Sequence, residues 1–323
     1  MSTKPPWLRV RLGLNENFLF LRGLLLDLGL HTVCEQANCP NAVECWNRRT
    51  ATFLILGDRC SRDCSFCAVA HGPLNKPAAD EPERVSNAVS RMGLSFAVIT
   101  SVTRDDLPDG GAGHFAETIA AIRRMTPGTL VEVLVPDFKG SRWAIERVAL
   151  AAPDVLGHNM ETVPRLYPAV RPGADFGRSL GLLAEARRLN GRLPLKSGLM
   201  LGLGESRDEV ERVLEHLLAT GCTILTLGQY LQPTKSHVPV ERFVTPEEFD
   251  EWREKALAMG FSGVAAAPLV RSSYHAQELY LKAKERMGEA TRHHVEGDAR
   301  RESGMHDAQR GDGQMRRGDS SFS

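Results

Sequence analysis

The sequence predicts an α/β protein built on a parallel β-sheet. Short segments rich in Val, Ile, Leu, Phe and Thr alternate with segments of helical apolar spacing from residue 52 to residue 259. Six strand-like segments are each followed by a helix-like one, which is the order that parallel strands with right-handed crossovers require. The most unusual motifs follow strand-like segments, as functional residues do in this fold class. The residues alone leave open whether the sheet forms a full or partial barrel or an open, doubly wound sheet.

The expected strands are short and apolar or β-branched, and they comprise residues 52–56, 96–100, 130–135, 155–158, 195–201 and 223–227. The expected helices repeat apolar residues every three or four positions, and they comprise residues 81–92, 114–124, 142–150, 180–189, 208–219 and 246–259. Two helices carry clear start signals. The first opens with Glu81-Pro82-Glu83, and the last has Thr245 as N-cap before Pro246 at the first helical position.

Three motif segments support this arrangement by their position. Residues 60–67, 103–113 and 158–162 each come directly after an expected strand. Because the carboxyl ends of parallel strands meet at one edge of the sheet, we expect these segments to lie close together.

Composition and charge narrow the class of protein. The 323 residues contain 42% hydrophobic residues, and the 40 basic residues balance the 40 acidic ones. A net charge of zero gives no electrostatic case for a nucleic acid or an anionic membrane as partner. The longest apolar segment, residues 19–30, is shorter than a membrane span and is broken by Arg22, Gly23 and Asp27. It also lacks a cleavage pattern of small residues, so we expect a cytoplasmic protein.

The cysteines are distributed unevenly. Six of the seven lie between Cys34 and Cys67, and Cys222 stands alone. Disulfide frameworks suit small secreted domains, and this chain is neither small nor visibly exported. Clustered thiols in a cytosolic protein are more typical of metal binding.

The first metal-binding motif is Cys60-Ser-Arg-Asp-Cys64-Ser-Phe-Cys67, with three and then two residues between the thiols. Soft thiolates at this density favour zinc or an iron–sulfur cluster. A structural zinc site usually has four protein ligands, and His71 is close enough in sequence to be considered as the fourth. A cluster held by three thiolates would instead leave one iron open to a cofactor or substrate.

The second motif contains Cys34, Cys39 and Cys45, with four and five residues between the thiols. By itself it fits buried cysteines, a zinc site or a cluster. Its position just before the first motif favours a second cluster that again lacks one ligand. Cys222 is a possible fourth ligand, but at the start of an expected strand it fits better as a small buried hydrophobic residue.

The run CEQANCPNAVECW, followed by CSRDCSFC, resembles the lipoyl synthase family of the radical S-adenosylmethionine (SAM) superfamily. The resemblance extends from about residue 14 to residue 283. It departs from the family at residues 71–77 and in the polar tail. Its further motifs are TSVTRDDLPDGGAGHF, HNMETVPRLYPAVRPGADF, LKSGLMLGLGE, LTLGQYLQPTKSHVPVERFVTPEEF and RSSYHA.

The resemblance implies a partial (β/α)6 TIM-like barrel of the radical SAM type at residues 51–265. An N-terminal extension, residues 1–50, would carry the cysteines of an auxiliary cluster. A C-terminal segment, residues 266–287, would carry a serine ligand of that cluster. Residues 288–323 form a tail with few apolar residues, which we expect to be disordered from its composition.

The resemblance also assigns the ligands of two [4Fe–4S] clusters. Cys60, Cys64 and Cys67 would hold the cluster that binds SAM. Ser273, in Arg271-Ser272-Ser273-Tyr274, would complete the auxiliary site of Cys34, Cys39 and Cys45. Without the resemblance, Ser273 would be interpreted as the N-cap of a following helix. A serine bond to a soft cluster should break more easily than a thiolate bond.

The contacts to SAM are expected from position and residue type. An aromatic residue such as Phe66 commonly lies near the adenine in this superfamily, and Gly110 and Gly111 resemble the segment that approaches the methionyl amine. Asn159, Glu161 and Lys196 lie near expected strand ends and offer polar contacts to the ribose and the carboxylate. The alternatives are an ordinary turn for the glycines and surface or capping roles for the polar residues.

The implied activity is insertion of two sulfur atoms at C6 and C8 of a protein-bound octanoyl chain. These C–H bonds are not acidic, so a radical made by reductive cleavage of SAM must open them. The implied partners are octanoylated lipoyl-carrier domains (glycine cleavage H protein and 2-oxoacid dehydrogenase E2), reduced ferredoxin or flavodoxin, and an iron–sulfur carrier protein. The rivals are another radical SAM sulfur-inserting enzyme, acting on a small molecule or tRNA, and a zinc-binding structural protein.

Overall fold

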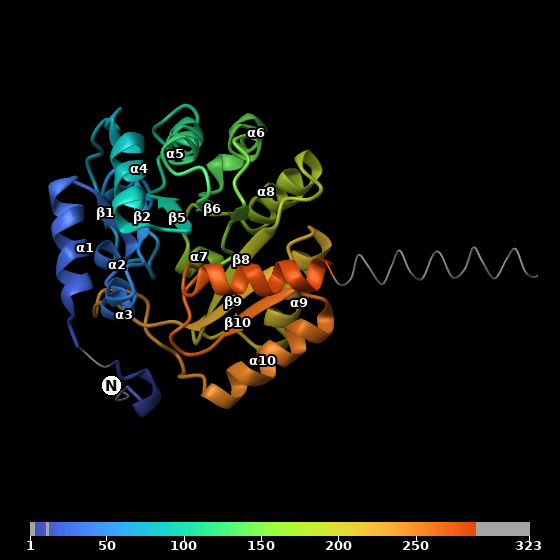
Figure 1. Cartoon of the computed structure of the whole chain (residues 1–323). Coiled ribbons are helices and arrows are strands. Elements are labelled where there is room, and N and C mark those ends of the chain that lie inside the picture. Colours follow the sequence, from blue (N-terminus) through green and yellow to red (C-terminus); the bar gives the residue numbers. More distant parts are fainter. Residues whose placement is uncertain (1–3, 11–12, 289–323) are drawn as a thin grey trace, which may run out of the picture.

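The computed structural model describes residues 4–10 and 13–288 (Figure 1). The expectation of a disordered tail at residues 288–323 therefore falls, apart from Gly288, outside the described residues. Within them, eight strands form one sheet in the order β1-β2-β5-β6-β7-β8-β9-β10. The strands are β1 (His31–Thr32), β2 (Thr52–Ile55), β5 (Phe96–Ser101), β6 (Leu130–Leu134), β7 (Val155–Gly157), β8 (Leu195–Leu201), β9 (Ile224–Gln229) and β10 (Gly263–Ala266). β1 pairs antiparallel with β2, and every other pair is parallel.

Helices connect neighbouring parallel strands and lie on the outer side of the curved sheet (Figure 1). These are α4 (Glu81–Met92), α5 (Ala112–Met125), α6 (Arg142–Leu150), α8 (Phe176–Leu189), α9 (Arg207–Ala219) and α10 (Pro246–Met259). The other named elements are α1 (Glu16–Asp27), α2 (Val33–Gln36), α3 (Ala42–Asn47), α7 (Tyr167–Val170), the 3-10 turns at Pro6–Leu8, Phe138–Gly140 and Pro164–Leu166, and a small pair of strands, β3 (Arg59–Cys60) and β4 (Ala70–His71).

The strand order decides between the two expected architectures. Parallel strands follow one another across the sheet in chain order, without the reversal that defines a doubly wound sheet. Among the described residues, β1 and β10 each pair on one side only, so the barrel is partial and not closed. The expected α/β fold with a partial barrel is confirmed. It contains seven parallel strands, one more than the six predicted.

Local sequence explains where the helices begin. The N-cap predicted at Thr245 is confirmed, because its side chain accepts a hydrogen bond from the backbone N–H of Glu248. Ser206 and Glu209 form a reciprocal capping box at the start of α9. α8 starts four residues before the predicted position 180, because Asp175 caps it by accepting from the N–H of Arg178.

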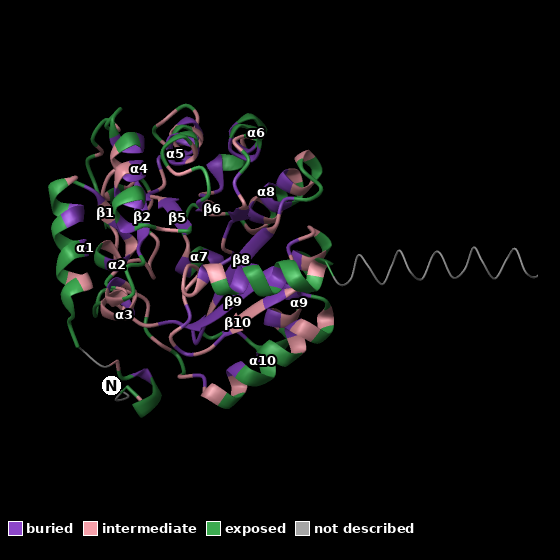
Figure 2. Cartoon of the chain, viewed as in Figure 1, coloured by how far each residue is buried: buried purple, intermediate pink, exposed green. Residues whose placement is uncertain are grey.

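The core lies between the sheet and the outer helices, and the residues coloured as buried concentrate there (Figure 2). All four residues of β2 and all six of β9 are buried, as expected for parallel strands covered on both faces. No helix in the described ranges is long and apolar enough to cross a membrane.

A C-terminal helix, residues 276–288, covers the end of the barrel where the strands begin. Its Tyr280 packs against Phe96, with ring centroids 5.8 Å apart, and its Leu279 packs against Ile224. Phe96 and Ile224 are the first residues of β5 and β9. The chain segment just before this helix is thereby held inside the amino-terminal end of the barrel.

Candidate functional site

A single cavity of about 570 Å³ joins the two ends of the barrel. At the carboxyl ends of the strands it is lined by the loop that follows β2 and carries Cys60, Cys64 and Cys67. At the other end it is lined by Thr52 and Phe96, the first residues of β2 and β5. The remaining lining residues of interest are Cys34, Cys39, Cys45 and Ser273. Both cysteine motifs therefore face the same space.

The loop of the first motif leaves β2 through a left-handed turn. Leu56 and Gly57 have φ values of 69° and 95°. The Leu56 N–H donates to Glu81 Oε2 at 2.8 Å, and its carbonyl accepts from Arg104 at 3.0 Å. Left-handed backbone is costly for a residue with a branched side chain, so two buried charged partners hold this turn in place.

The rest of this loop is fastened at both ends. The Ser61 N–H donates to the Thr103 carbonyl at 2.9 Å, which ties the loop to the segment after β5. The Cys67 carbonyl lies 3.0 Å from His237 Nε2, which ties the loop to the segment after β9. The cysteine loop is therefore positioned by the carboxyl ends of other strands, as its place in the sequence predicts.

The second motif folds around the beginning of β2. Thr32 caps α2, which carries Cys34. The Thr52 backbone lies close enough to the Cys34 thiol to oppose the rise of its pKa, and the Thr52 hydroxyl donates to Ser273 Oγ at 2.7 Å. Thr52 thus brings Ser273 beside the second motif. Ser273 lies two residues before the N-cap position of the C-terminal helix, so the N-cap interpretation does not hold.

Burial makes four of the cavity thiols poor acids. It raises the pKa of Cys34 and Cys64 to about 11 and that of Cys45 and Cys67 to about 12. Neighbouring thiols of the same motif raise these pKa values further, because two thiolates would repel. Thiols of this kind stay neutral near pH 7, and a metal would have to displace their protons on binding.

Five residues, which we call the clasp, link α3 to the segment that carries Ser273; they are Glu44, Arg48, Tyr274, His275 and Glu278. The Tyr274 hydroxyl donates to Glu44 Oε1 at 2.9 Å, and Arg48 pairs with Glu278 at 2.9 Å. His275, which has a φ of 51°, lies between Arg48 and Glu278. The clasp holds Ser273 next to the helix that carries Cys45.

Three of the six expected SAM contacts line the cavity, namely Phe66, Asn159 and Glu161. Glu161 has a left-handed φ of 63°, and burial raises its pKa, with the nearby Arg171 opposing the shift. A carboxyl buried in this way favours a hydrogen-bonding or cationic ligand.

Gly110 and Gly111 do not line this cavity. Gly111 is the N-cap of α5, with a φ of 89°, and a Cβ atom on it would overlap Leu56 Cδ1. Gly110 has a φ of 59° and lies against Phe138, beside a separate small hollow. The two glycines therefore form a turn that packs against the residues that follow β2. This agrees with the alternative given for them above, an ordinary turn.

Lys196 does not line the cavity either. It is the second residue of β8 and so lies near the amino-terminal end of the barrel, not at the strand's carboxyl end. Its ammonium pairs with Glu132 at 2.7 Å, with side chains 3% and 2% exposed. Burial raises the pKa of Glu132, and the charge of Lys196 opposes that shift. The ion pair with Glu132 therefore explains the buried position of Lys196 without any contact to a cofactor.

Several buried polar atoms of the cavity wall have no hydrogen-bond partner among the described residues. Buried polar groups are normally paired, so unpaired ones in a cavity indicate where a polar ligand would bind. They are Asn41 Oδ1, Ser101 Oγ, His158 Nε2, Asn159 Oδ1 and Arg171 Nε. Burial, together with the charge of Arg171, lowers the pKa of His158 to about 4, so its imidazole is neutral.

Sequence reasoning missed two half-buried cations of the cavity, Arg171 and Arg271. Arg171 donates to the carbonyls of Asn159 and Met160 at 3.1 Å. Arg271 lies close enough to Cys39 and Glu161 for their charges to oppose the lowering of its pKa by burial. Both arginines lie inside sequence motifs that carry the family resemblance, so those motifs could have identified them as candidate site residues.

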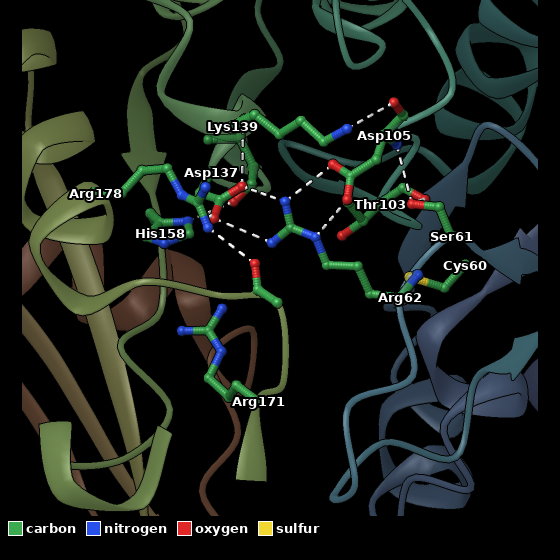
Figure 3. A network of polar contacts seen from close by, with 12 residues as sticks. Cys60, Ser61, Arg62, Thr103, Asp105, Asp137, Lys139, His158, Arg171 and Arg178 are labelled. Atoms are coloured by element: carbon green, nitrogen blue, oxygen red, sulfur yellow. Dashed lines mark hydrogen bonds and ion pairs between the residues drawn. The ribbon is translucent and has the colours of Figure 1, made fainter. Parts of the chain in front are cut away.

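Sequence reasoning also missed a network of ion pairs around Arg62 (Figure 3). Arg62 donates to Asp105 at 2.7 Å and to Asp137 at 2.6 Å, and Arg178 donates to Asp137 at 2.9 Å. Asp137 is fully buried, which by itself would raise its pKa, but hydrogen bonds and the charge of Arg62 lower it to about 2. The available signal was an arginine between two cysteines of the first motif.

The two alternative ligands lie outside the cavity. His71 is exposed and lies 3.4 Å from Asp63. Cys222 is 0% exposed and donates to the Leu195 carbonyl at 3.5 Å, which agrees with its expected role as a small buried residue. All seven cysteines belong to the described part of the chain, and all are free thiols. In residues 4–10 and 13–288, no three or more His, Cys, Asp or Glu side chains are arranged to hold a single metal ion.

The first parallel strand of the partial barrel, β2, leads into a loop with three cysteines. This combination of fold and loop is typical of one class of protein. The sequence model of the Radical SAM superfamily matches residues 54–217, half of the chain, and includes that loop. The solved structure of HydG, a maturase of the [FeFe]-hydrogenase, has the same fold, with a TM-score of 0.55 at 14% identity over 71% of this chain and 54% of HydG.

Curated relatives narrow the class further. The lipoyl synthase of Alkaliphilus metalliredigens is 50% identical over 285 residues, which cover 88% of this chain and 98% of the relative. That of Nitrosococcus oceani is 55% identical over 274 residues, covering 84% and 85%. The chain belongs to the lipoyl synthase family, a family of radical SAM enzymes. The family resemblance of the two cysteine motifs is thus confirmed.

Proposed function

We propose that this chain converts a protein-bound octanoyl-lysine to lipoyl-lysine by inserting one sulfur atom at C6 and one at C8. Membership of the two groups implies a [4Fe–4S] cluster and SAM. The observation that carries the finer proposal is the single cavity lined by both cysteine motifs, one at each end of the barrel. A substrate chain in that cavity would have a cluster site on either side of it.

The residues at the carboxyl end of the cavity suit the first cluster and SAM. Cys60, Cys64 and Cys67 supply three soft ligands, and each thiolate of a [4Fe–4S] cluster binds a different iron. The unpaired atoms of Asn159 and Arg171 suit the hydroxyl and carboxylate groups of SAM. Phe66 offers an apolar surface for the adenine.

The residues at the other end suit an auxiliary cluster. Cys34, Cys39 and Cys45 supply three thiolates, and Ser273, hydrogen-bonded to Thr52, supplies an oxygen ligand. A hard oxygen on a soft cluster is the weakest of the four attachments, as a cluster that gives up sulfur requires. When bound, the two clusters and SAM supply the radical and the sulfur that replaces hydrogen.

The chain's own residues position the acyl group and exclude water. Between the two cysteine motifs the cavity wall is apolar, which suits an octanoyl chain. Its apolar residues include Leu54, Val98, Leu134, Leu199 and Met200. A radical held in this setting is shielded from solvent.

The proposed partners follow from this chemistry. They are octanoylated lipoyl-carrier domains such as glycine cleavage H protein and 2-oxoacid dehydrogenase E2, reduced ferredoxin or flavodoxin as reductant, and an iron–sulfur carrier that rebuilds the auxiliary cluster.

We also propose that the chain divides into an N-terminal extension at residues 1–50, a barrel at 51–265 and a C-terminal segment at 266–287. This division is supported by β10, which ends at Ala266.

One anaerobic experiment tests the proposal. Two loaded sites correspond to about eight iron atoms per chain and matching sulfide. Incubation with an octanoyl-lysyl peptide, SAM and a strong reductant should yield 5′-deoxyadenosine and a peptide that has gained two sulfur atoms. A colourless protein with one or two zinc ions, or SAM cleavage with no sulfur in the peptide, would refute the proposal.

A further inference from the structure

Arg62 lies between two proposed cluster ligands, yet its side chain binds the loops that follow two other strands of the barrel (Figure 3). Its guanidinium contacts Asp105 through Nε and Nη2, at 2.7 and 2.9 Å. It contacts Asp137 through Nη1 and Nη2, at 3.0 and 2.6 Å. The Arg62 side chain is 8% exposed, so these four hydrogen bonds are shielded from water.

The two carboxylates are firm anchors. Asp105 follows β5, and its backbone N–H donates to Ser61 Oγ at 3.0 Å. Asp137 follows β6 and also accepts hydrogen bonds from the Lys139 backbone N–H at 3.1 Å and from Arg178 at 2.9 Å. Arg62 is thereby fixed to the carboxyl ends of two strands.

The backbone of the same residue reaches a ligand sulfur. The Arg62 N–H donates to Cys60 Sγ at 3.4 Å. Hydrogen bonds to the sulfur ligands of an iron–sulfur cluster help to set its reduction potential. Such a bond stabilises the extra negative charge of the reduced state, so it favours reduction.

We propose that Arg62 is a positioning residue that raises the reduction potential of the cluster held by Cys60, Cys64 and Cys67. Its bidentate attachment to Asp105 and Asp137 holds the residue 62 N–H on the sulfur of Cys60. The inference rests on the proposed assignment of these cysteines as cluster ligands. A planar fork can engage two carboxylates at once, which a lysine ammonium does not reproduce.

The charges of the network make it possible to distinguish two effects on the reduction potential, the positioning of the Arg62 N–H and the electrostatic effect of the charges themselves. Arg62 and Arg178 balance Asp105 and Asp137. Removing Asp105 takes a negative charge away, which by electrostatics alone would raise the potential. The same removal loosens Arg62, which by the proposed positioning would lower the potential. The two explanations therefore predict opposite signs for Asp105→Ala.

The experiment uses the full chain with its iron–sulfur sites loaded anaerobically. The variants are Arg62→Gln, Arg62→Lys, Asp105→Ala and, as matched control, Arg178→Gln, which takes one positive charge from Asp137 without touching the cysteine loop. Iron per chain is measured first. A potentiometric titration then follows the EPR signal that changes on addition of SAM.

We expect Arg62→Gln and Asp105→Ala to make the potential more negative, lowering the ratio of reduced to oxidised cluster at a fixed potential by up to about tenfold. Tenfold corresponds to about 59 mV for one electron. Arg62→Lys should lie between Arg62→Gln and the unsubstituted chain, and Arg178→Gln should shift the potential much less.

A more positive or unchanged potential in Asp105→Ala would overturn the inference, as would equal shifts in Arg62→Gln and Arg178→Gln. Should Arg62→Gln fail to hold iron, Asp105→Ala and Arg62→Lys still decide the sign. If the unsubstituted chain shows no signal that responds to SAM, the proposed function fails. If it does and Asp105→Ala leaves the potential unchanged, only the role of Arg62 fails.

Discussion

At the scale of single residues, the two cysteine motifs have equal numbers of thiols but face the cavity from opposite ends. A substitution in either motif therefore tests a different proposed step, SAM cleavage for the first motif and sulfur insertion for the second. Burial raises the pKa of Cys64 and that of Cys34 alike, so the difference between these two thiols comes from their neighbours. Cys64 lies near Arg171 and Glu161, whereas Cys34 shares Thr52 with Ser273.

We expect Cys64→Ala to abolish SAM cleavage and sulfur insertion together. Cys34→Ala should still form 5′-deoxyadenosine but lose sulfur insertion to background. Both products are measurable in one reaction by mass spectrometry. Cys222→Ala is the matched control, because that thiol is buried outside the cavity, and it should retain both activities. A sulfur-containing product from Cys34→Ala would contradict the assignment of the auxiliary site.

Lys196 should prove structural. Lys196→Met leaves the Glu132 carboxylate buried without its partner, which should lower the free energy of unfolding by about 3–5 kcal/mol. The double variant with Glu132→Met should regain most of that loss. Denaturant unfolding measures both. SAM affinity of the folded single variant should be unchanged, and a specific loss of SAM binding would restore Lys196 as a cofactor contact.

Gly111 should also prove structural. Gly111→Ala places a Cβ on Leu56 at a φ of 89°, and we expect a loss of about 2 kcal/mol or more in the free energy of unfolding. Gly128→Ala is the control, because nothing lies within 4 Å of a Cβ there. Thermal unfolding of the two variants makes the comparison. Equal stability of the two would show that the turn tolerates a side chain.

At the scale of elements, hydrophobic patterning predicted most of the barrel. The strand predicted at 195–201 agrees with β8 at both ends, where Pro194 precedes the strand and Gly202 follows it. β10 was missed, because its sequence GVAA contains a single β-branched residue and depends on pairing with β9 for its definition. The C-terminal helix was expected only as a helix following Ser273, without bounds. Its packing was not predicted, because the strand ends that it covers are distant in sequence.

The clasp allows a prediction about one element moving against another. Arg48→Met removes the ion pair with Glu278 and the contact with His275, so the segment with Ser273 should separate more easily from α3. We expect the auxiliary iron to be lost to a chelator several-fold faster, while the signal that responds to SAM persists. The control is Arg124→Met, which removes a comparably exposed ion pair with Glu83 elsewhere. Equal rates of iron loss would exclude a role for the clasp.

At the scale of the whole molecule, the sequence predicted the site only in part. Cysteine spacing is local, so it indicated two incomplete metal sites directly. Ser273 came from resemblance alone, because its contact with Thr52 joins residues 221 positions apart. The partners of Arg62, Asp105 and Asp137, lie 43 and 75 positions away, and no local pattern encodes such pairs.

Iron removal should loosen the molecule as a whole. The proposed auxiliary ligands come from both ends of the described chain, so a bound cluster would join the N-terminal extension to the C-terminal segment. Because metal binding adds to folding free energy, we expect the iron-loaded chain to unfold at a Tm several degrees above the iron-free chain. Ser273→Ala should reduce this difference in Tm, and Cys222→Ala should not. A Tm independent of iron would contradict the proposal.

The bond between Thr52 and Ser273 also has a consequence for how the protein is made. At roughly 5–20 residues per second, a ribosome needs roughly 10–45 s to add the 221 residues between these positions. For that interval the thiols at positions 34, 39 and 45 have left, or are leaving, the ribosome without their proposed fourth partner. The proposed auxiliary centre could therefore be completed only after residue 273 is synthesised. Until then, we expect these three thiols to need a reducing environment in the nascent protein.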